Sequence, residues 1–182
     1  MSDKAILPQY TKPKQSAVNM SQPENLLPSI LRGDRITPLA ATTYFNALPP
    51  ISLESLIGSW RGTCVLTDHP GTKPLLDVHW EGKTFRSVND VDPIIVRDGN
   101  GKRVVNGFMG KARVEGEQIR EVKYNGVVSA AMIYNEKPII DYFRKINDHT
   151  VIGVMDALES TADHGLYFIL ERIGDEEDKG KL

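Results

Sequence analysis

The chain has 182 residues, 40% of them hydrophobic, which suits one domain with a single core. A formal net charge of −2 gives no electrostatic reason to expect a nucleic acid or an anionic membrane as partner. Cys64 is the only cysteine, which excludes an internal disulfide and fits a reducing compartment. The first residues lack the apolar run of a signal peptide, and no window approaches the roughly eighteen apolar residues of a membrane helix. We therefore expect a cytoplasmic protein without a membrane span.

The N-terminal part of the chain predicts an arm followed by two short helices. Residues 1–23 are polar and interrupted by prolines, which favours a flexible arm. Within residues 24–50, a first helix is expected over 24–32 and a second over 37–47. The second begins with Thr37 as the capping residue, and its expected apolar side chains are Leu39, Tyr44, Phe45 and Leu48. This segment is expected to pack its apolar faces on a sheet.

The pattern changes between Ser52 and Gly62. Ser52 can cap a helical turn, whose apolar side is Leu53, Leu56 and Ile57, and Gly58 can end that turn. From Trp60 the period becomes two, which predicts the first strand of a sheet.

The remainder of the chain reads as short β-rich runs separated by turn residues. Residues 98–101, Asp-Gly-Asn-Gly, are the clearest hairpin signal, and residues 87–90 are expected to form one helical turn. The expected strands cover residues 60–68, 75–81, 83–86, 94–97, 102–105, 112–115, 119–124, 127–134, 138–146, 151–157 and 166–173. Residues 174–182 are charged and predict a flexible tail.

A meander of this length leaves two exposed edges unless it closes on itself. We therefore predict a mainly β fold, in which residues 51–173 form a closed antiparallel lipocalin-like barrel with short N-terminal helices. Barrels of about eight or more strands leave room for one small ligand.

The motif Gly58-Ser59-Trp60-Arg61-Gly62 resembles the Gly-x-Trp signature of lipocalins and calycins. Together with the preceding residues 48–52, it resembles more closely a family named for its Gly-x-Trp-x-Gly motif. That family continues into a second block of unknown function, which residues 79–85, 122–134 and 138–144 match. The resemblance covers about residues 41–172 and implies no particular reaction. In lipocalin-like barrels an Arg of the last strand crosses the first-strand Trp, so Arg172 is expected to lie over Trp60.

Several kinds of chemistry find little support in the sequence. The four histidines are scattered without metal-ligand spacing, so no metal site or cofactor is expected. Haem binding through His164 is an alternative, by likeness to another barrel family; an exposed loop position for His164 is favoured. Cys64 shares a face with Trp60, which predicts a buried, unreactive thiol.

The best evidence for a cavity is the run from Val127 to Tyr134. Both of its faces are nearly apolar, so we expect it to be covered on both sides, by the lumen and by a helix or a second protomer. Its small residues Ser129, Ala130 and Ala131 leave space where larger side chains would fill a core.

The candidate site consists of the polar and aromatic side chains expected around that space. An inward carboxylate at Asp141 needs a partner, for which Arg144, Lys123 and Tyr124 are candidates. The catalytic candidates are Asp141, His79 and Tyr134, although a core network that fixes strand register is the commoner role for such residues. The expected ligand-binding residues are Tyr124, Ser129, Met132, Tyr134, Asp141, Phe143, Asp156 and His79.

The favoured function is binding of a small hydrophobic molecule in the barrel. One alternative is a cofactor-free isomerase or cyclase that acts on a hydrophobic metabolite in the lumen. The others are haem binding and a homodimeric interaction module that uses the two-sided apolar strand.

Overall fold

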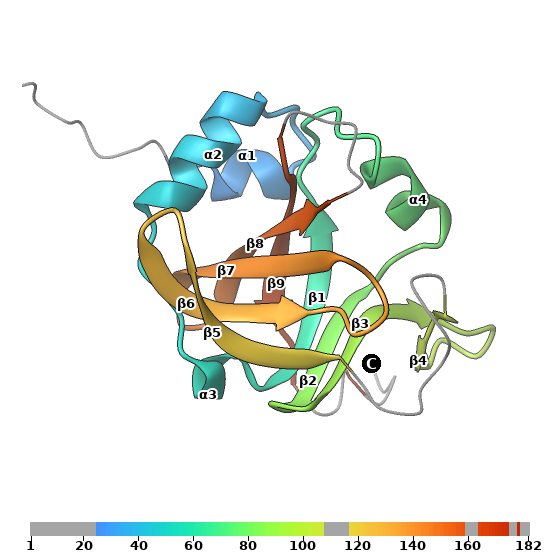
Figure 1. Ribbon diagram of the computed structural model, residues 1–182. Helices are drawn as coiled ribbons and strands as arrows, with labels where there is room; N and C mark the ends of the chain where they lie inside the picture. The colour runs from blue at the N-terminus through green and yellow to red at the C-terminus, as the bar shows by residue number, and fades with distance from the viewer. Residues whose placement is uncertain (1–24, 108–116, 159–163, 175–177, 179–182) are drawn as a thin grey trace, which may run out of the picture.

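The computed structural model describes residues 25–107, 117–158, 164–174 and 178. They form one antiparallel sheet with short helices around it (Figure 1). The helices are α1 (Leu27–Leu31), α2 (Pro38–Ala47), α3 (Leu53–Leu56) and α4 (Thr72–Asp77). The strands are β1 (Gly58–Cys64), β2 (Gly82–Ser87), β3 (Asp90–Arg97), β4 (Arg103–Val105), β5 (Gln118–Tyr124), β6 (Val127–Ile133), β7 (Ile139–Asn147), β8 (Thr150–Ala157) and β9 (Leu166–Arg172).

The strand order is β4-β3-β2-β1-β9-β8-β7-β6-β5, so β1 and β9 join the two halves of the sheet. Within the described residues the sheet curls until its two arms approach each other but does not close, so the prediction of a closed barrel is wrong. The two arms meet at a bridge between Val91 of β3 and Glu117, the residue before β5, which exchange backbone hydrogen bonds of 3.1 and 3.0 Å. Arg120 on β5 donates hydrogen bonds to Val88 O and to the Asn89 side chain, which hold the β2–β3 turn against β5 beside this bridge.

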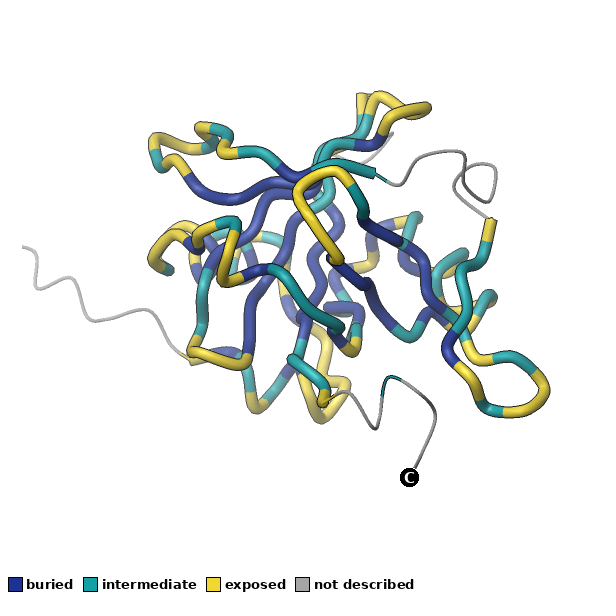
Figure 2. Tube along the Cα trace, turned by 90° about the horizontal axis from the view of Figure 1, so that it is seen from below, coloured by how far each residue is buried: buried dark blue, intermediate teal, exposed yellow. Residues whose placement is uncertain are grey.

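The core lies on both faces of the sheet. Figure 2 shows that the strands are largely buried and the turns around them exposed. On the inner face, Trp60, Phe85 and Phe143 belong to one buried cluster. On the outer face, Phe45 of α2 packs with Ala131 of β6 in a second cluster. The expectation that the strand from Val127 is covered on both sides is thus confirmed, with a helix as the outer cover.

The two N-terminal helices lie close to their expected positions. Thr37 caps α2 by accepting a hydrogen bond from Ala40 N at 3.2 Å, and Pro38 fits the first turn because its missing N–H has no helical partner there. Tyr44 and Phe45 are buried as expected, whereas Leu39 is 77% exposed, so its assignment to the apolar face was wrong.

The largest local difference from expectation concerns residues 75–81, which do not form a strand. Residues 72–77 form α4 instead, and the chain then turns at His79, which has a φ of 54°. The alternation of Leu75, Asp77 and His79 suggested a strand, but the Lys73–Asp77 ion pair supports a helical turn. Residues 87–90 likewise form a tight β2–β3 turn rather than a helical turn.

Other expectations are confirmed, and some lie outside the described residues. The Asp98 turn joins β3 to β4 as a hairpin, with Asp98 Oδ1 accepting hydrogen bonds from Asn100 N and Lys102 N. The expected strand over residues 112–115, the arm over 1–23 and most of the tail over 174–182 lie outside the described residues.

The Gly-x-Trp-x-Gly motif has a structural explanation at the start of β1. Trp60 is fully buried, and its Nε1 donates a hydrogen bond to Leu56 O at 2.8 Å. The guanidinium of Arg172 lies over the Trp60 ring, 4.2 Å from the centre of that ring. A Cβ on Gly58, whose φ is +133°, would lie 2.4 Å from Arg172 Nη1. A Cβ on Gly62 would lie 2.5 Å from the ring of Trp80. The two glycines therefore make room for the side chains of Arg172 and Trp80.

Candidate functional site

A cavity of about 170 Å³ lies between α4 and the inner face of the sheet. Its wall is mostly apolar and comes from α4 with its preceding residue, from the segment that links α4 to β2, and from six strands or their ends. The lining residues are Gly71, Pro74, Leu75, Trp80, Lys83, Ile94, Tyr134, Asp141, Met155, Leu166 and Phe168. Ser129, Ala130 and Ala131 are not among them, so the small-residue argument placed the space at the wrong part of the sheet.

One wall of the cavity carries a buried ion pair. Lys83 Nζ on β2 lies 2.8 Å from Asp141 Oδ2 on β7, and the two side chains are 3% and 1% exposed. Lys83 pairs with Trp60 in the β1–β2 register and points to the same inner face as Phe85. The curl of the sheet brings β2 across from β7, which is why two strands distant in the sheet can supply one pair.

Tyr134 completes this polar group. Its hydroxyl lies 3.4 Å from Lys83 Nζ, which also donates to Pro93 O at 3.3 Å. The ammonium lies 5.1 Å from the ring centre of Phe168 and 5.6 Å from that of Trp80, so aromatic faces stabilise the charge where water is excluded.

The ionisation of the group follows from its burial. Burial raises the pKa of Asp141, while the Lys83 ammonium and the Tyr134 hydroxyl lower it and oppose that rise. Burial and the nearby carboxylates Asp141 and Glu117 raise the pKa of Tyr134 well above its ordinary value, so it remains a neutral hydroxyl. The site therefore offers a cation, a carboxylate of raised pKa and a neutral phenol on one wall of an apolar cavity.

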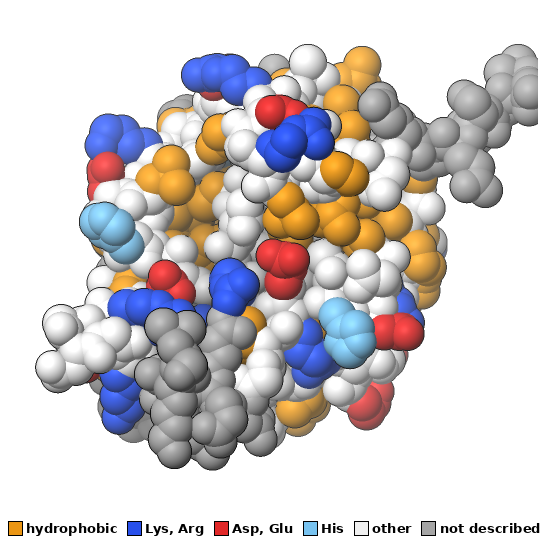
Figure 3. All heavy atoms as spheres, turned by 180° about the vertical axis from the view of Figure 1, so that it is seen from behind, with side chains coloured by type: hydrophobic (Ala, Val, Ile, Leu, Met, Phe, Trp, Pro, Cys, Tyr) orange, Lys and Arg blue, Asp and Glu red, His pale blue; other side chains and the backbone are white. Residues whose placement is uncertain are grey.

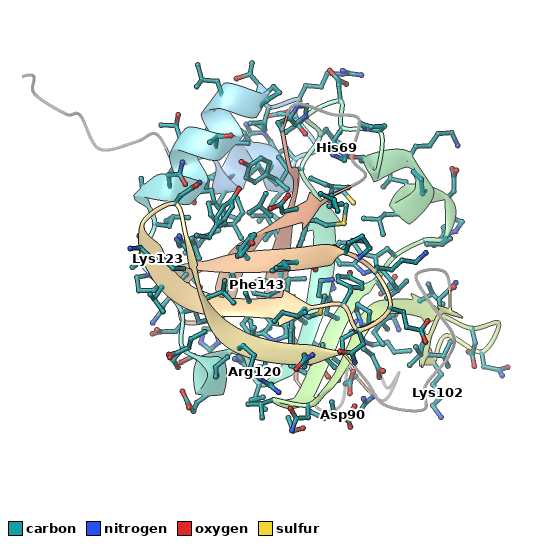
Figure 4. All side chains as sticks on the ribbon, viewed as in Figure 1. His69, Asp90, Lys102, Arg120, Lys123 and Phe143 are labelled. Carbon is teal, nitrogen blue, oxygen red and sulfur yellow. The ribbon has the colours of Figure 1, made fainter. Side chains whose placement is uncertain are left out.

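Of the residues expected at the site, the structure brings Tyr134 and Asp141 together at the cavity wall. Met132 and Phe143 are buried in the inner cluster but do not line the cavity; Figure 4 shows Phe143 on β7 in the middle of the sheet.

The other expected site residues lie elsewhere. His79 is exposed in the turn after α4, and Asp156 is exposed at a shallow hollow on the outer face. Tyr124 stacks on Tyr142 in the outer layer, with ring centres 3.9 Å apart. Ser129 accepts from Ile51 N at 3.0 Å and donates to Phe143 O at 2.8 Å, which is a structural role.

Sequence reasoning missed Lys83 and Trp80 as site residues. It proposed Arg144, Lys123 and Tyr124 as partners of Asp141, but Arg144 faces the outer layer, where its guanidinium lies over the Phe45 ring and donates to Tyr124 O. The available signal was the alternation of Lys83 with Phe85, which places a lysine on the apolar face of a strand. That β2 faces β7 could not be read from this pattern.

Cys64 is buried as predicted, with 9% of its surface exposed. Burial raises the pKa of its thiol to about 11, and the nearby Lys83 ammonium opposes that rise. His164 does not line the cavity; its ring lies 5.4 Å from that of His69, at the end of the sheet opposite to Asp90 (Figure 4). Within the described residues, no group of three or more His, Cys, Asp or Glu side chains could hold a metal ion.

The surface carries apolar side chains as well as charges, as the face in Figure 3 shows. The exposed large hydrophobic residues of the described parts are Leu31, Leu39, Leu76, Val88, Val128 and Leu158. No helix in these parts has the length and apolar character that a membrane crossing requires.

The fold and the cavity define a small protein with a curled antiparallel sheet, opened by a Gly-x-Trp-x-Gly strand. Comparison with protein families gives two matches in chain order, "GXWXG protein" over residues 43–101 and "Domain of unknown function (DUF4334)" over residues 115–172. The chain belongs to this GXWXG family with a DUF4334 segment, which confirms the resemblance seen in the sequence.

A solved structure supports the same assignment. It is described as a protein from Thermomonospora curvata, and it is 34% identical to this chain with a TM-score of 0.73. The match covers 82% of this chain and 96% of the other. No curated protein matches the chain.

Proposed function

We propose that the protein binds a small, mostly apolar molecule in the cavity between α4 and the sheet. The observation that carries the proposal is the cavity itself, which is lined mainly by Leu, Ile, Met, Pro and aromatic side chains and has one polar wall. Ligand sites commonly combine an apolar lining with a few placed polar groups in this way.

The volume limits the size of the ligand. An apolar protein cavity of about 150 Å³ holds benzene, so about 170 Å³ suits a molecule of one ring or the inner end of a longer one. Toluene is therefore a suitable first probe, and we expect a Kd of about 0.1–1 mM, as the ligand efficiency of small apolar molecules implies. Calorimetric titration of the full chain with toluene measures this directly.

Trp80 supplies a second readout because its ring forms part of the cavity wall. Toluene is expected to change the fluorescence of the wild-type protein but not that of Trp80→Phe, in which Trp60 remains as reporter. Trp60 is fully buried under Arg172 and does not line the cavity.

Two variants of α4 test the location. Leu75 lines the cavity, whereas its neighbour Leu76 is 54% exposed and does not. Leu75→Phe adds volume at the wall and is expected to abolish calorimetric binding of toluene, while Leu76→Phe leaves it unchanged. Equal binding by both variants would place the bound toluene elsewhere and contradict the proposal.

A second candidate function is acid–base catalysis by a cofactor-free isomerase or cyclase, favoured by the buried Asp141 beside Lys83 and Tyr134. A carboxylate of raised pKa is a better base near neutral pH than an exposed one. The test is proton exchange at the carbon beside the carbonyl of cyclohexanone in deuterated water, followed by NMR. Asp141→Asn is expected to abolish the exchange while the circular dichroism spectrum is kept; equal exchange in both proteins leaves plain binding as the function.

A further inference from the structure

We infer that the molecule bound in this cavity is a neutral compound with a hydroxyl group, which donates its proton to Oδ1 of Asp141. The inference rests on the proposed function, since it assigns the ligand class to the same cavity. It follows from which hydrogen-bonding atoms at the polar wall are already engaged and which are left for a ligand.

The donors of Lys83 are fully engaged by the protein. An ammonium has three N–H groups, and Lys83 Nζ has three acceptors within reach, namely Asp141 Oδ2 at 2.8 Å, Pro93 O at 3.3 Å and Tyr134 Oη at 3.4 Å. A ligand that needs a strong donor from Lys83 would have to displace one of these partners.

The Tyr134 hydroxyl acts as a donor toward the Asp141 carboxylate, whose pKa it lowers, so the capacity left at the wall is that of an acceptor. Asp141 is 1% exposed and lines the cavity, and its Oδ1 accepts no hydrogen bond of regular geometry from the residues that the structure describes. A buried carboxylate oxygen without a donor costs free energy, which a ligand that supplies a donor recovers on binding. The ligand must therefore carry an O–H or N–H group.

The charge of the site selects a neutral donor. Lys83 and Asp141 form a buried pair whose charges cancel, so a cationic amine would compete with Lys83 and bury an excess positive charge. An anion would face the carboxylate of Asp141 directly. A neutral alcohol, phenol or enol meets both conditions, and the remaining apolar wall accommodates its hydrocarbon part.

Phenol and toluene form a matched pair of probes, because a hydroxyl in one replaces a methyl group in the other. The preference for phenol over toluene, measured by calorimetry as the ratio of the two Kd values, should fall about tenfold to a hundredfold in the double variant Lys83→Met/Asp141→Leu. Replacing both charges by apolar groups of similar size is compatible with folding, and because both probes are measured in each protein, the ratio corrects for any change in apolar binding. The control variant is Lys145→Met/Asp148→Leu, which removes an exposed pair and should leave the ratio unchanged.

Anisole tests the inference in the wild-type protein, independently of any variant. Its oxygen accepts hydrogen bonds but has no proton to donate, so it should bind at least about tenfold more weakly than phenol. Anisole binding as tight as that of phenol, or a ratio unaffected by the double variant, overturns the inference while toluene binding upholds the cavity. Failure of both toluene and phenol to bind the wild-type protein overturns the proposed function itself, and this inference with it.

Discussion

The guanidinium of Arg172 lies over the ring of Trp60 at 4.2 Å and donates from Nη1 to Ile57 O at 2.8 Å. It also reaches Ser55 O, so one side chain of the last strand joins α3 to the first strand. Trp60 and Arg172 are direct neighbours in the β1–β9 register, which ties the two halves of the curled sheet together at its centre.

Arg172→Met should therefore destabilise the protein. It removes the cation–π contact and the donors to two backbone carbonyls, and we expect a loss of about 2–3 kcal/mol of unfolding free energy. Urea denaturation followed by circular dichroism measures this. Lys123→Met removes an exposed charge on β5 and should change stability by less than about 0.5 kcal/mol; an equally small effect for Arg172→Met would show that Trp60 does not depend on its partner.

Gly62→Ala should affect both stability and the cavity. The added Cβ would lie 2.5 Å from the ring of Trp80, so the Trp80 ring must shift at the cavity wall. This ring also contacts Phe168, with 5.6 Å between the two ring centres. We expect a loss of about 1–3 kcal/mol and weaker toluene binding. Gly99→Ala is the control, since a Cβ there meets nothing within 4 Å. Toluene binding at wild-type strength in Gly62→Ala would mean that Trp80 does not shape the cavity.

Substitutions of Lys83 and Asp141 should have strongly non-additive effects on the free energy of unfolding. Lys83→Met leaves a buried carboxylate without its cation and is expected to cost about 3–5 kcal/mol, whereas Lys83→Met/Asp141→Leu should come within about 1 kcal/mol of wild type. Urea denaturation of the wild type, Lys83→Met, Asp141→Leu and the double variant measures the coupling. Additive losses in the double variant would indicate that the two side chains contribute independently of each other.

The cost of Lys83→Met should also depend on pH. Without the ammonium, the pKa of Asp141 in the folded protein rises further above its ordinary value of 3.8, because burial is no longer opposed. A folded-state pKa above the unfolded one means that the folded state binds the proton more tightly, so the variant is relatively most stable below pH 3.8. The difference in unfolding free energy between wild type and Lys83→Met should grow as the pH rises through the folded-state pKa of Asp141. A difference that shrinks over this range would contradict the prediction.

The Cys64 thiol should be nearly inert in the folded protein. Burial raises its pKa from 9.0 to about 11, so the reactive thiolate is about a hundredfold rarer than for an unperturbed thiol at mildly alkaline pH. Reaction with a disulfide reagent such as dithionitrobenzoate should be slow in buffer and fast in denaturant. Because the folded-state pKa is raised, this thiol's contribution to stability is complete below pH 9.0 and is lost as the pH rises toward about 11. Cys64→Ala should show a shallower alkaline loss of stability over this interval.

Local patterns in the sequence predicted most of the elements. The cap at Thr37, the hairpin at Asp98, the burial of Cys64 and the Trp60–Arg172 contact depend on neighbours in the chain or on a family motif. Period-two alternation located the strands from β5 to β9, because each has an apolar face that must be buried. The family itself was recognisable from the Gly-x-Trp-x-Gly motif and the block that follows it.

The site was decided by the tertiary structure. Tyr134 and Asp141 were expected at the site, but the partner of Asp141 is Lys83, which comes from the far arm of the sheet. The cavity lies under α4, a segment whose alternation suggested a strand, and it is bounded there by Pro74 and Leu75. Alternation fixes which face of a strand a side chain occupies, but the twist and curl of the sheet determine which strands face each other, and these depend on packing between residues far apart in the chain.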